Sequence, residues 1–304
     1  MSPLEIIYQK AREKKRTVVF PEANDDRIIR AVSDVAALSL ARPVLLGQPD
    51  KILNQAEKIG VNLDLNKIEI VNTAGSDSNP LSFGAMLVSK GEGDAMVAGA
   101  VNTTADVFRV AFQIIGPAEK GMTVSSYFLM IIPDCPYGEE GAFLFADAGI
   151  VPEPSPSQLA NIAIATADNI VSLLSYEPRV AMLSFSTKSS AEHRSVERVQ
   201  KATQIVREKK PDLIVDGELQ VDAAIVSEVA AKKAPDSPVG GKANVLIFPD
   251  LDAANISYKL VERLAKAEAY GPVFQGLNKP VSDLSRGCRI RDIINCSAIV
   301  AASA

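Results

Sequence analysis

The sequence of 304 residues contains no tryptophan, one histidine and three cysteines. With His193 as the only histidine, a zinc site built from several histidines is excluded, and a histidine-dependent catalytic triad is disfavoured. His193 lies in "AEHRS", where the start of a helix favours a surface or capping role. Cys135, Cys288 and Cys296 show no spacing typical of a metal site or a disulfide framework, which favours a reduced, cytosolic protein.

Long apolar runs and an excess of positive charge are also missing. No run reaches about 18 apolar residues, and the first 16 residues lack the apolar core of a signal peptide. The formal net charge of −5 provides no basic field for nucleic acid or a membrane surface, so we expect neither partner. No GxGxxG follows the first predicted strand and no GxxxxGK[ST] occurs, which disfavours a Rossmann dinucleotide site and a P-loop.

Short β-branched runs alternate with helical patterns along nearly the whole chain, which predicts an α/β protein with mainly parallel sheets. The length is sufficient for two hydrophobic cores. Two adjacent runs, 122–133 and 141–149, are joined by a turn-rich segment and predict an antiparallel hairpin. The other predicted strands are 17–22, 43–47, 67–72, 95–100, 179–186, 212–217 and 244–250, and the predicted helices include 25–40, 103–115, 223–234 and 253–269.

Polar stretches follow several of these strands, among them "AGAVNTTAD", "SFSTKSSAEHR", "VDGELQVDAA" and "FPDLDAANIS". In open α/β sheets, ligands bind beyond the carboxyl ends of the strands. Each stretch alone is compatible with an ordinary strand-to-helix loop, whereas several together favour a polar cleft. Ser186, Lys188 and Asn255 in these stretches are candidate substrate-binding residues.

The segment "DLSRGCRIRD", residues 283–292, combines a hydroxyl, a guanidinium, a glycine and a thiol. Isoleucines recur on one face of a predicted amphipathic C-terminal helix that starts near Arg289. Ser285, Arg286 and Gly287 then lie at or just before the helix N-terminus, where outward N–H groups favour an anion. Arg286 adds a planar fork for phosphate or an oxyanion, and Gly287 permits close approach. The alternative is a capping serine and a solvated arginine.

Cys288 in the same segment has two possible roles. The neighbouring arginines Arg286, Arg289 and Arg291 favour a lowered thiol pKa, as a nucleophile requires, but the one histidine is far away in sequence. Free cysteine more often behaves as a small buried apolar residue. We favour the second role, and a covalent intermediate on Cys288 stays open as the alternative.

Several long blocks together resemble the phosphate acetyltransferase (phosphotransacetylase) family, and the likeness covers nearly the whole chain. They include "FPEANDDR", "AGAVNTTADVFR", "EPRVAMLSFSTKSSA", the segment from "VDGELQVDAA" to "KAEAYGP", and "GPVFQGLNKPVSDLSRGC". The resemblance implies reversible acetyl transfer between acetyl phosphate and coenzyme A (CoA), which gives acetyl-CoA and phosphate. It also implies a homodimer and two isocitrate-dehydrogenase-like α/β domains, 1–118 plus 272–304 and 119–271, with the site in an interdomain cleft.

The resemblance also assigns roles to individual residues. Ser285 and Arg286 match the active-site serine and arginine of the family, and Asp292 matches the aspartate regarded as the base for the CoA thiol. Arg109 matches an arginine thought to bind the substrate phosphate. Cys135 matches a cysteine near the site that the ternary-complex mechanism does not need as a nucleophile. No cofactor is expected, since CoA is a substrate, and no acidic cluster suits a metal ion.

The sequence departs from the family at residues 73–80. Family members usually carry a longer, basic segment there, with an arginine implicated in CoA binding, whereas this chain has only "TAGSDSNP". The CoA phosphates would then meet other groups, such as Arg289, Arg291 or Lys259, or CoA would bind more weakly. Two alternatives follow: a phosphate acyltransferase for a longer acyl group such as butyryl, or a degenerate paralogue that only binds CoA or an acyl phosphate.

Overall fold

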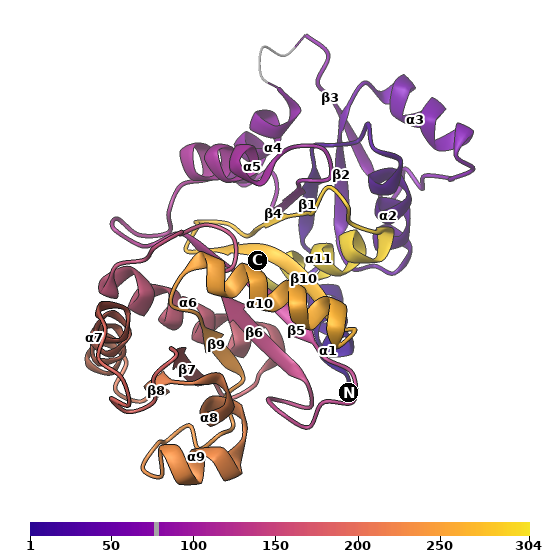
Figure 1. Ribbon diagram of the computed structural model, residues 1–304. Helices are drawn as coiled ribbons and strands as arrows, with labels where there is room; N and C mark the ends of the chain where they lie inside the picture. The colour runs from indigo at the N-terminus through magenta and orange to yellow at the C-terminus, as the bar shows by residue number, and fades with distance from the viewer. Residues whose placement is uncertain (76–78) are drawn as a thin grey trace. The chain divides into compact units, whose positions relative to one another are not determined.

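The computed structural model describes residues 1–75 and 79–304. Contacts between Cα atoms divide the chain into two compact units. Unit 1 comprises Met1–Gly121 and Gly271–Ala304, and unit 2 comprises Met122–Tyr270. Unit 1 is therefore discontinuous in sequence, and Figure 1 shows the yellow C-terminal helix α11 among the indigo N-terminal elements.

The sheet of unit 1 has the strand order β3-β2-β1-β4-β11-β10. Its first five strands are parallel, and β10 is antiparallel to β11. The bounds are β1 (Thr17–Phe20), β2 (Arg42–Gly47), β3 (Glu69–Asn72), β4 (Ala95–Ala98), β10 (Glu268–Gln275, in unit 1 from Gly271 on) and β11 (Val281–Asp283). The helices are α1 (Pro3–Lys14), α2 (Asp26–Ala37), α3 (Pro49–Lys58), α4 (Pro80–Lys90), α5 (Thr104–Val110), the π-helical turn η1 (Ala111–Ile115) and α11 (Ile290–Ser303).

The sheet of unit 2 has the order β5-β6-β9-β7-β8. β5 and β6 form the predicted antiparallel hairpin, and the remaining pairs are parallel. The bounds are β5 (Ser125–Ile131), β6 (Ala142–Ala146), β7 (Arg179–Leu183), β8 (Ile214–Leu219) and β9 (Val245–Ile247). The helices are α6 (Pro156–Leu174), α7 (Arg194–Lys209), α8 (Val221–Ile225), α9 (Ser227–Lys233) and α10 (Leu251–Leu264).

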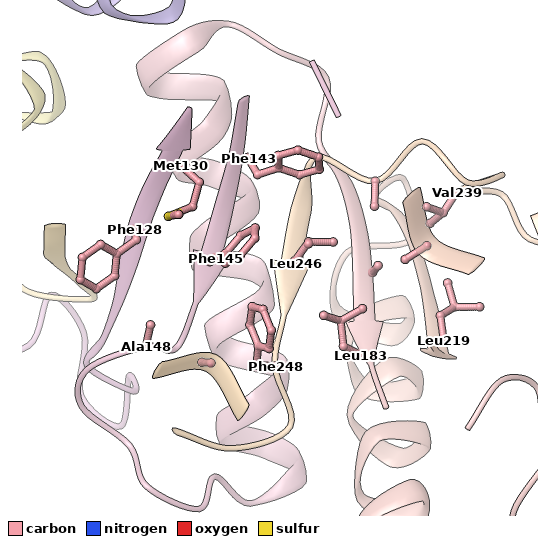
Figure 2. Packing of buried hydrophobic residues seen from close by; sticks show 14 of the residues in the cluster. Phe128, Met130, Phe143, Phe145, Ala148, Leu183, Leu219, Val239, Leu246 and Phe248 are labelled. Carbon is pink, nitrogen blue, oxygen red and sulfur yellow. The ribbon is translucent and has the colours of Figure 1, made fainter. Parts of the chain in front are cut away.

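The hydrophobic core of unit 2 contains several of the few aromatic residues of the chain (Figure 2). The rings of Phe145 and Phe248 lie 5.2 Å apart between centroids, and Tyr258 of α10 stacks on Phe128 of β5 at 4.1 Å. Aromatic pairs at these separations add about 0.5–1.5 kcal/mol beyond the area that they bury. This packing holds α10 against the sheet without any tryptophan.

The predicted strands and helices are all present; several boundaries differ by a few residues, and two helices differ most clearly. The helix predicted at 223–234 is divided into α8 and α9, because Val226 between them is extended. The helix predicted at 253–269 ends at Leu264, since Lys266 has a left-handed φ of 54° and β10 begins at Glu268. His193 caps α7 by accepting the backbone N–H of Ser195, as its sequence context predicted.

The C-terminal helix α11 begins at Ile290, close to the predicted start. The expectation that it is amphipathic was wrong, because its residues from Asn295 to Ala302 are all buried. α1, α2 and the strands β1, β4 and β11 pack against it, and together they cover its faces. Among the described residues we find no helix that could span a lipid bilayer.

Candidate active site

The segment 284–289 connects β11 to α11 in unit 1, with Ser285, Arg286 and Gly287 exposed. The N–H of Leu284 donates to the Ala98 carbonyl at 2.6 Å, which joins the start of this loop to the end of β4. The Ser285 carbonyl accepts the N–H of Cys288 at 2.8 Å, and its hydroxyl accepts the N–H of Gly287 at 3.2 Å. The loop is therefore a tight turn just before the helix, as the sequence predicted.

Arg286 leaves this turn with an exposed side chain, and within the described part of the chain no hydrogen bond or ion pair engages its guanidinium. Arg109 is also exposed, at the end of α5, and pairs with Asp106 at 2.8 Å. Water screens an exposed pair of this kind, so an incoming anion can replace Asp106 at small cost. Two arginines of unit 1 are thus available to an anionic ligand.

Asp292 lies in the first turn of α11 and forms a capping interaction with Arg289. One carboxylate oxygen accepts the backbone N–H of Arg289 at 2.8 Å, and the other lies 3.2 Å from its Nη2 atom. The Asp292 side chain is 19% exposed, so a ligand can reach it. Because it accepts the N–H of Arg289, the residue that directly follows Cys288, this carboxylate lies beside the turn.

Cys288 is buried, with 7% of its surface exposed. Burial raises the pKa of its thiol to about 11, and the positive charge of Arg27 offsets only part of this increase. The thiol is therefore protonated at neutral pH. This environment favours the role of a small apolar residue over that of a nucleophile.

Two buried carboxyl groups near the turn were not singled out from the sequence. Glu22, just after β1, accepts hydrogen bonds from the backbone N–H groups of Ala100, Val101 and Asn102 at 2.7–3.2 Å. Asp283, the last residue of β11, is 1% exposed, and no described residue makes a hydrogen bond to either of its oxygens. The pattern that could have identified both residues is an acidic residue at the end of a buried strand or shortly after it.

Burial raises the pKa of Asp283 to about 7. The Thr104 side chain lowers this pKa in part, although it does not reach hydrogen-bonding geometry, and the charge of Glu22 raises it. Gly99 has a φ of +102°, and a Cβ there would collide with the Asp283 carboxyl. Glycine at this position therefore makes room for the acid.

Ser186, Lys188 and Asn255 lie in unit 2, where each has an intramolecular partner. Ser186 is fully buried and donates to Glu218 at 3.0 Å. Lys188 pairs at 2.6 Å with Asp216, whose side chain is fully buried. A substrate anion would have to compete with that carboxylate, which is more costly than the displacement of an exposed partner.

Asn255 of α10 lies between a backbone carbonyl and a lysine. Its side-chain N–H donates to the Ala148 carbonyl at 3.4 Å, and its oxygen accepts from Lys259 at 2.9 Å. Lys259, one of the alternative CoA contacts, is thus held on the exposed side of the helix. Within residues 1–75 and 79–304, no three His, Cys, Asp or Glu side chains are grouped so as to hold a metal ion.

Comparison with known proteins identifies the family of this chain. The profile of the family described as Phosphate acetyl/butaryl transferase matches residues 2–80 and 76–301. The phosphate acetyltransferase of Thermoanaerobacterium thermosaccharolyticum is 45% identical over 331 aligned positions, which cover 100% of both chains. A phosphotransacetylase crystal structure from Streptococcus pyogenes is 39% identical, with a TM-score of 0.90 over 100% of this chain and 99% of that chain. The chain belongs to the phosphate acetyl/butaryl transferase family.

Membership of the phosphate acetyl/butaryl transferase family confirms the resemblance and the enzyme class, an acyltransferase. The predicted dehydrogenase-like α/β class is also confirmed. A 4-hydroxythreonine-4-phosphate dehydrogenase from Burkholderia phymatum has a TM-score of 0.58 over 93% of this chain and 98% of that chain. At 11% identity, this likeness concerns the fold alone.

The family profile matches in two pieces that meet at residues 76–80. The alignment with the Thermoanaerobacterium phosphate acetyltransferase spans 331 positions, 27 more than the 304 residues of this chain. The break in the profile match falls at this segment and supports the prediction that residues 73–80 are short relative to the family. Residues 76–78 of this segment lie outside the described residues.

Proposed function

We propose that this chain catalyses reversible transfer of an acetyl group between acetyl phosphate and CoA. The observation that carries the proposal is 45% identity to a phosphate acetyltransferase over the full length of both chains. The exposed Ser285 and Arg286, with the Asp292 carboxylate on the following helix, supply chemistry that suits this reaction.

The first step is removal of the thiol proton. A thiol with a pKa of about 8.5 is only a few per cent ionised at pH 7, so a carboxylate beside it promotes formation of the attacking thiolate. We assign this base to Asp292. The proton moves from the CoA sulfur to the Asp292 carboxylate and leaves with the phosphate product or solvent.

The second step is attack of the thiolate on the acetyl carbonyl carbon. A C–S bond forms as the C–O bond to phosphate breaks, so the products are acetyl-CoA and inorganic phosphate. Negative charge grows on the carbonyl oxygen during attack, and Ser285 and Arg286 stabilise it by hydrogen bonding. One such donor contributes on the order of 10²–10³ in rate. Arg109 holds the phosphate group after exchanging its exposed Asp106 partner.

The decisive experiment measures thiol consumption with CoA and acyl phosphates from acetyl to butyryl. Acetyl phosphate should give the highest kcat/KM, and inorganic phosphate should drive the reverse reaction from acetyl-CoA. A preference for butyryl phosphate would support the longer-acyl alternative, because one methylene changes discrimination by about 1–3 kcal/mol. No turnover with any acyl phosphate would contradict both enzyme proposals and leave the binding paralogue.

The short 73–80 segment bears on CoA affinity. We propose that Arg289, Arg291 and Lys259 contribute to the contacts with the CoA phosphates. Reversal of each charge, for example Lys259→Glu, should raise the KM for CoA several-fold and leave the KM for acetyl phosphate nearly unchanged. An unchanged KM for CoA in all three variants would contradict this assignment.

We further propose a metal-independent enzyme that acts in the cytoplasm as a homodimer. Three unpaired cysteines suit a reducing compartment. On α10, Ile256, Leu260 and Leu264 are more than half exposed at helical spacing, which suits contact with a second copy. Light scattering should give twice the chain mass, and Leu260→Arg should shift the mass toward the monomer. A monomeric wild type would contradict the dimer.

Metal independence has its own test. Activity should survive dialysis against EDTA. Loss of activity that added metal restores would contradict metal independence.

A further inference from the structure

The guanidinium of Arg27, in the first turn of α2, uses all five of its N–H donors within unit 1. Nε and Nη2 donate to the two oxygens of Asp25 at 2.9 and 2.6 Å, and Nη2 also donates to the Ala100 carbonyl at 3.0 Å. Nη1 donates to the carbonyls of Arg286 at 2.8 Å and Cys288 at 3.0 Å. An arginine has five such donors, so none is left for a substrate.

These bonds connect three segments that are distant in sequence. Asp25 and Arg27 follow β1, Ala100 follows β4, and the 286–288 turn follows β11. β1, β4 and β11 are parallel neighbours in the sheet, so their carboxyl ends lie side by side. Arg27 is thus placed where the loops of three adjacent strands meet.

The bonds to the 286–288 turn constrain its backbone from one side. The carbonyls of Arg286 and Cys288 both accept from Nη1, while the Arg286 side chain is exposed and has no partner in the described residues. The turn has few other bonds, chiefly the one between the Cys288 N–H and the Ser285 carbonyl. Loss of Arg27 would therefore free the backbone that carries Ser285 and Arg286.

We propose that Arg27 is a positioning residue for acyl transfer: it fixes the backbone of the 286–288 turn so that the side chains of Ser285 and Arg286 meet the developing charge. This inference rests on the function proposed above. Asp25 supports it by holding the opposite edge of the guanidinium, since a bidentate carboxylate fixes both position and orientation.

The first test is Arg27→Ala, with Arg30→Ala as its matched control. Arg30 lies on the same helix, and its one hydrogen bond to the described residues goes to the Ile59 carbonyl, away from the turn. Arg27→Ala should lower kcat about 10- to 100-fold with smaller changes in both KM values, because misplacement of reacting groups by about 1 Å can cost 10²-fold. Arg27→Lys should stay impaired, since a point charge cannot replace the fork. Arg30→Ala should keep the wild-type kcat.

A double-mutant cycle tests whether Arg27 acts through Arg286. If it does, most of the effect of Arg27→Ala should disappear in an Arg286→Ala background, because residues that act as a unit are non-additive. If the fold-losses in kcat of Arg27→Ala and Arg286→Ala simply multiply in the double variant, the proposal would be overturned. A wild-type kcat in Arg27→Ala or full activity in Arg27→Lys would also overturn it.

Hydrogen–deuterium exchange provides a readout that does not depend on activity. The peptide that contains residues 284–290 should exchange faster in Arg27→Ala than in the wild type and Arg30→Ala. If Arg27→Ala does not fold, Asp25→Asn provides the milder variant, because asparagine retains the helix cap and removes the charge that anchors Arg27. Unchanged exchange in the folded variants would overturn the proposal. If the wild type shows no turnover and this peptide still exchanges faster in Arg27→Ala, the result would contradict only the proposed function.

Discussion

The carboxylate of Asp292 accepts the backbone N–H of Arg289 at 2.8 Å, so the residue that we assign as the base also caps the helix that carries it. A substitution here must therefore separate loss of the base from loss of the cap. Asparagine satisfies this condition, because its side-chain oxygen still accepts the same hydrogen bond.

We expect Asp292→Asn to lower kcat/KM for CoA about 10²- to 10⁴-fold at pH 7, the usual contribution of a general base. The loss should shrink as pH rises through about 8.5, where the CoA thiol ionises without help. Initial rates between pH 6 and 9.5 provide the measurement, and Asp26→Asn, in the first turn of α2, provides the control. A ratio of variant to wild-type rates that does not change with pH would count against Asp292 as the base.

Arg286→Ala should lower kcat about 10²- to 10³-fold, because it removes a charged donor from the developing oxyanion. Its thermal stability should change little, since the guanidinium is exposed and has no partner in the described residues. Arg42→Ala, which removes an exposed arginine paired with Glu69, is the control and should remain active. Near-wild-type kcat in Arg286→Ala would remove this residue from the mechanism.

Cys288→Ala should keep most of the wild-type kcat, because burial raises the pKa of the thiol to about 11 and keeps it protonated. The folded state should lose on the order of 1 kcal/mol, since the side chain is buried. Steady-state kinetics and mass spectrometry of the enzyme after mixing with acetyl phosphate provide the measurements. A folded but inactive variant, together with an acetyl adduct on the wild-type thiol, would establish the covalent alternative.

Asp283→Asn should change how stability depends on pH. The folded-state pKa of about 7 lies above the ordinary value of about 3.9 for aspartate, so between these values the folded chain holds a proton that the unfolded chain releases. Rising pH then destabilises the wild type by up to about 1.4 kcal/mol per pH unit, and the effect ends above about pH 7. Asparagine does not titrate and removes this slope.

The measurement is the free energy of unfolding in urea at several pH values for the wild type, Asp283→Asn and the exposed control Asp26→Asn. The difference between Asp283→Asn and the wild type should grow with pH from about 4 to 7 and then stay constant. Contributions from all other carboxyl groups cancel in this difference. Parallel curves would show that Asp283 has an ordinary pKa in the folded chain.

Local patterns predicted most of the fold. Alternating β-branched runs and helical patterns identified the strands, because buried parallel strands require continuous apolar side chains. They did not predict the break at Val226 or the end of α10, which depend on single backbone conformations. They also suggested an amphipathic α11, since four isoleucines share a face, whereas packing from several sides buries every residue from Asn295 to Ala302.

The family and the turn that carries Ser285 and Arg286 could be predicted from the sequence, because both depend on contiguous residues. The groups that support this turn could be identified only from contacts between distant segments. Arg27 and Cys288 are 261 positions apart, and the three loops meet only because β1, β4 and β11 are neighbours in one sheet. The burial of Asp283 without a hydrogen-bond partner among the described residues is likewise a result of packing, which no local pattern specifies. Short-range order is encoded in neighbouring residues, whereas strand order and burial arise when distant segments pack together.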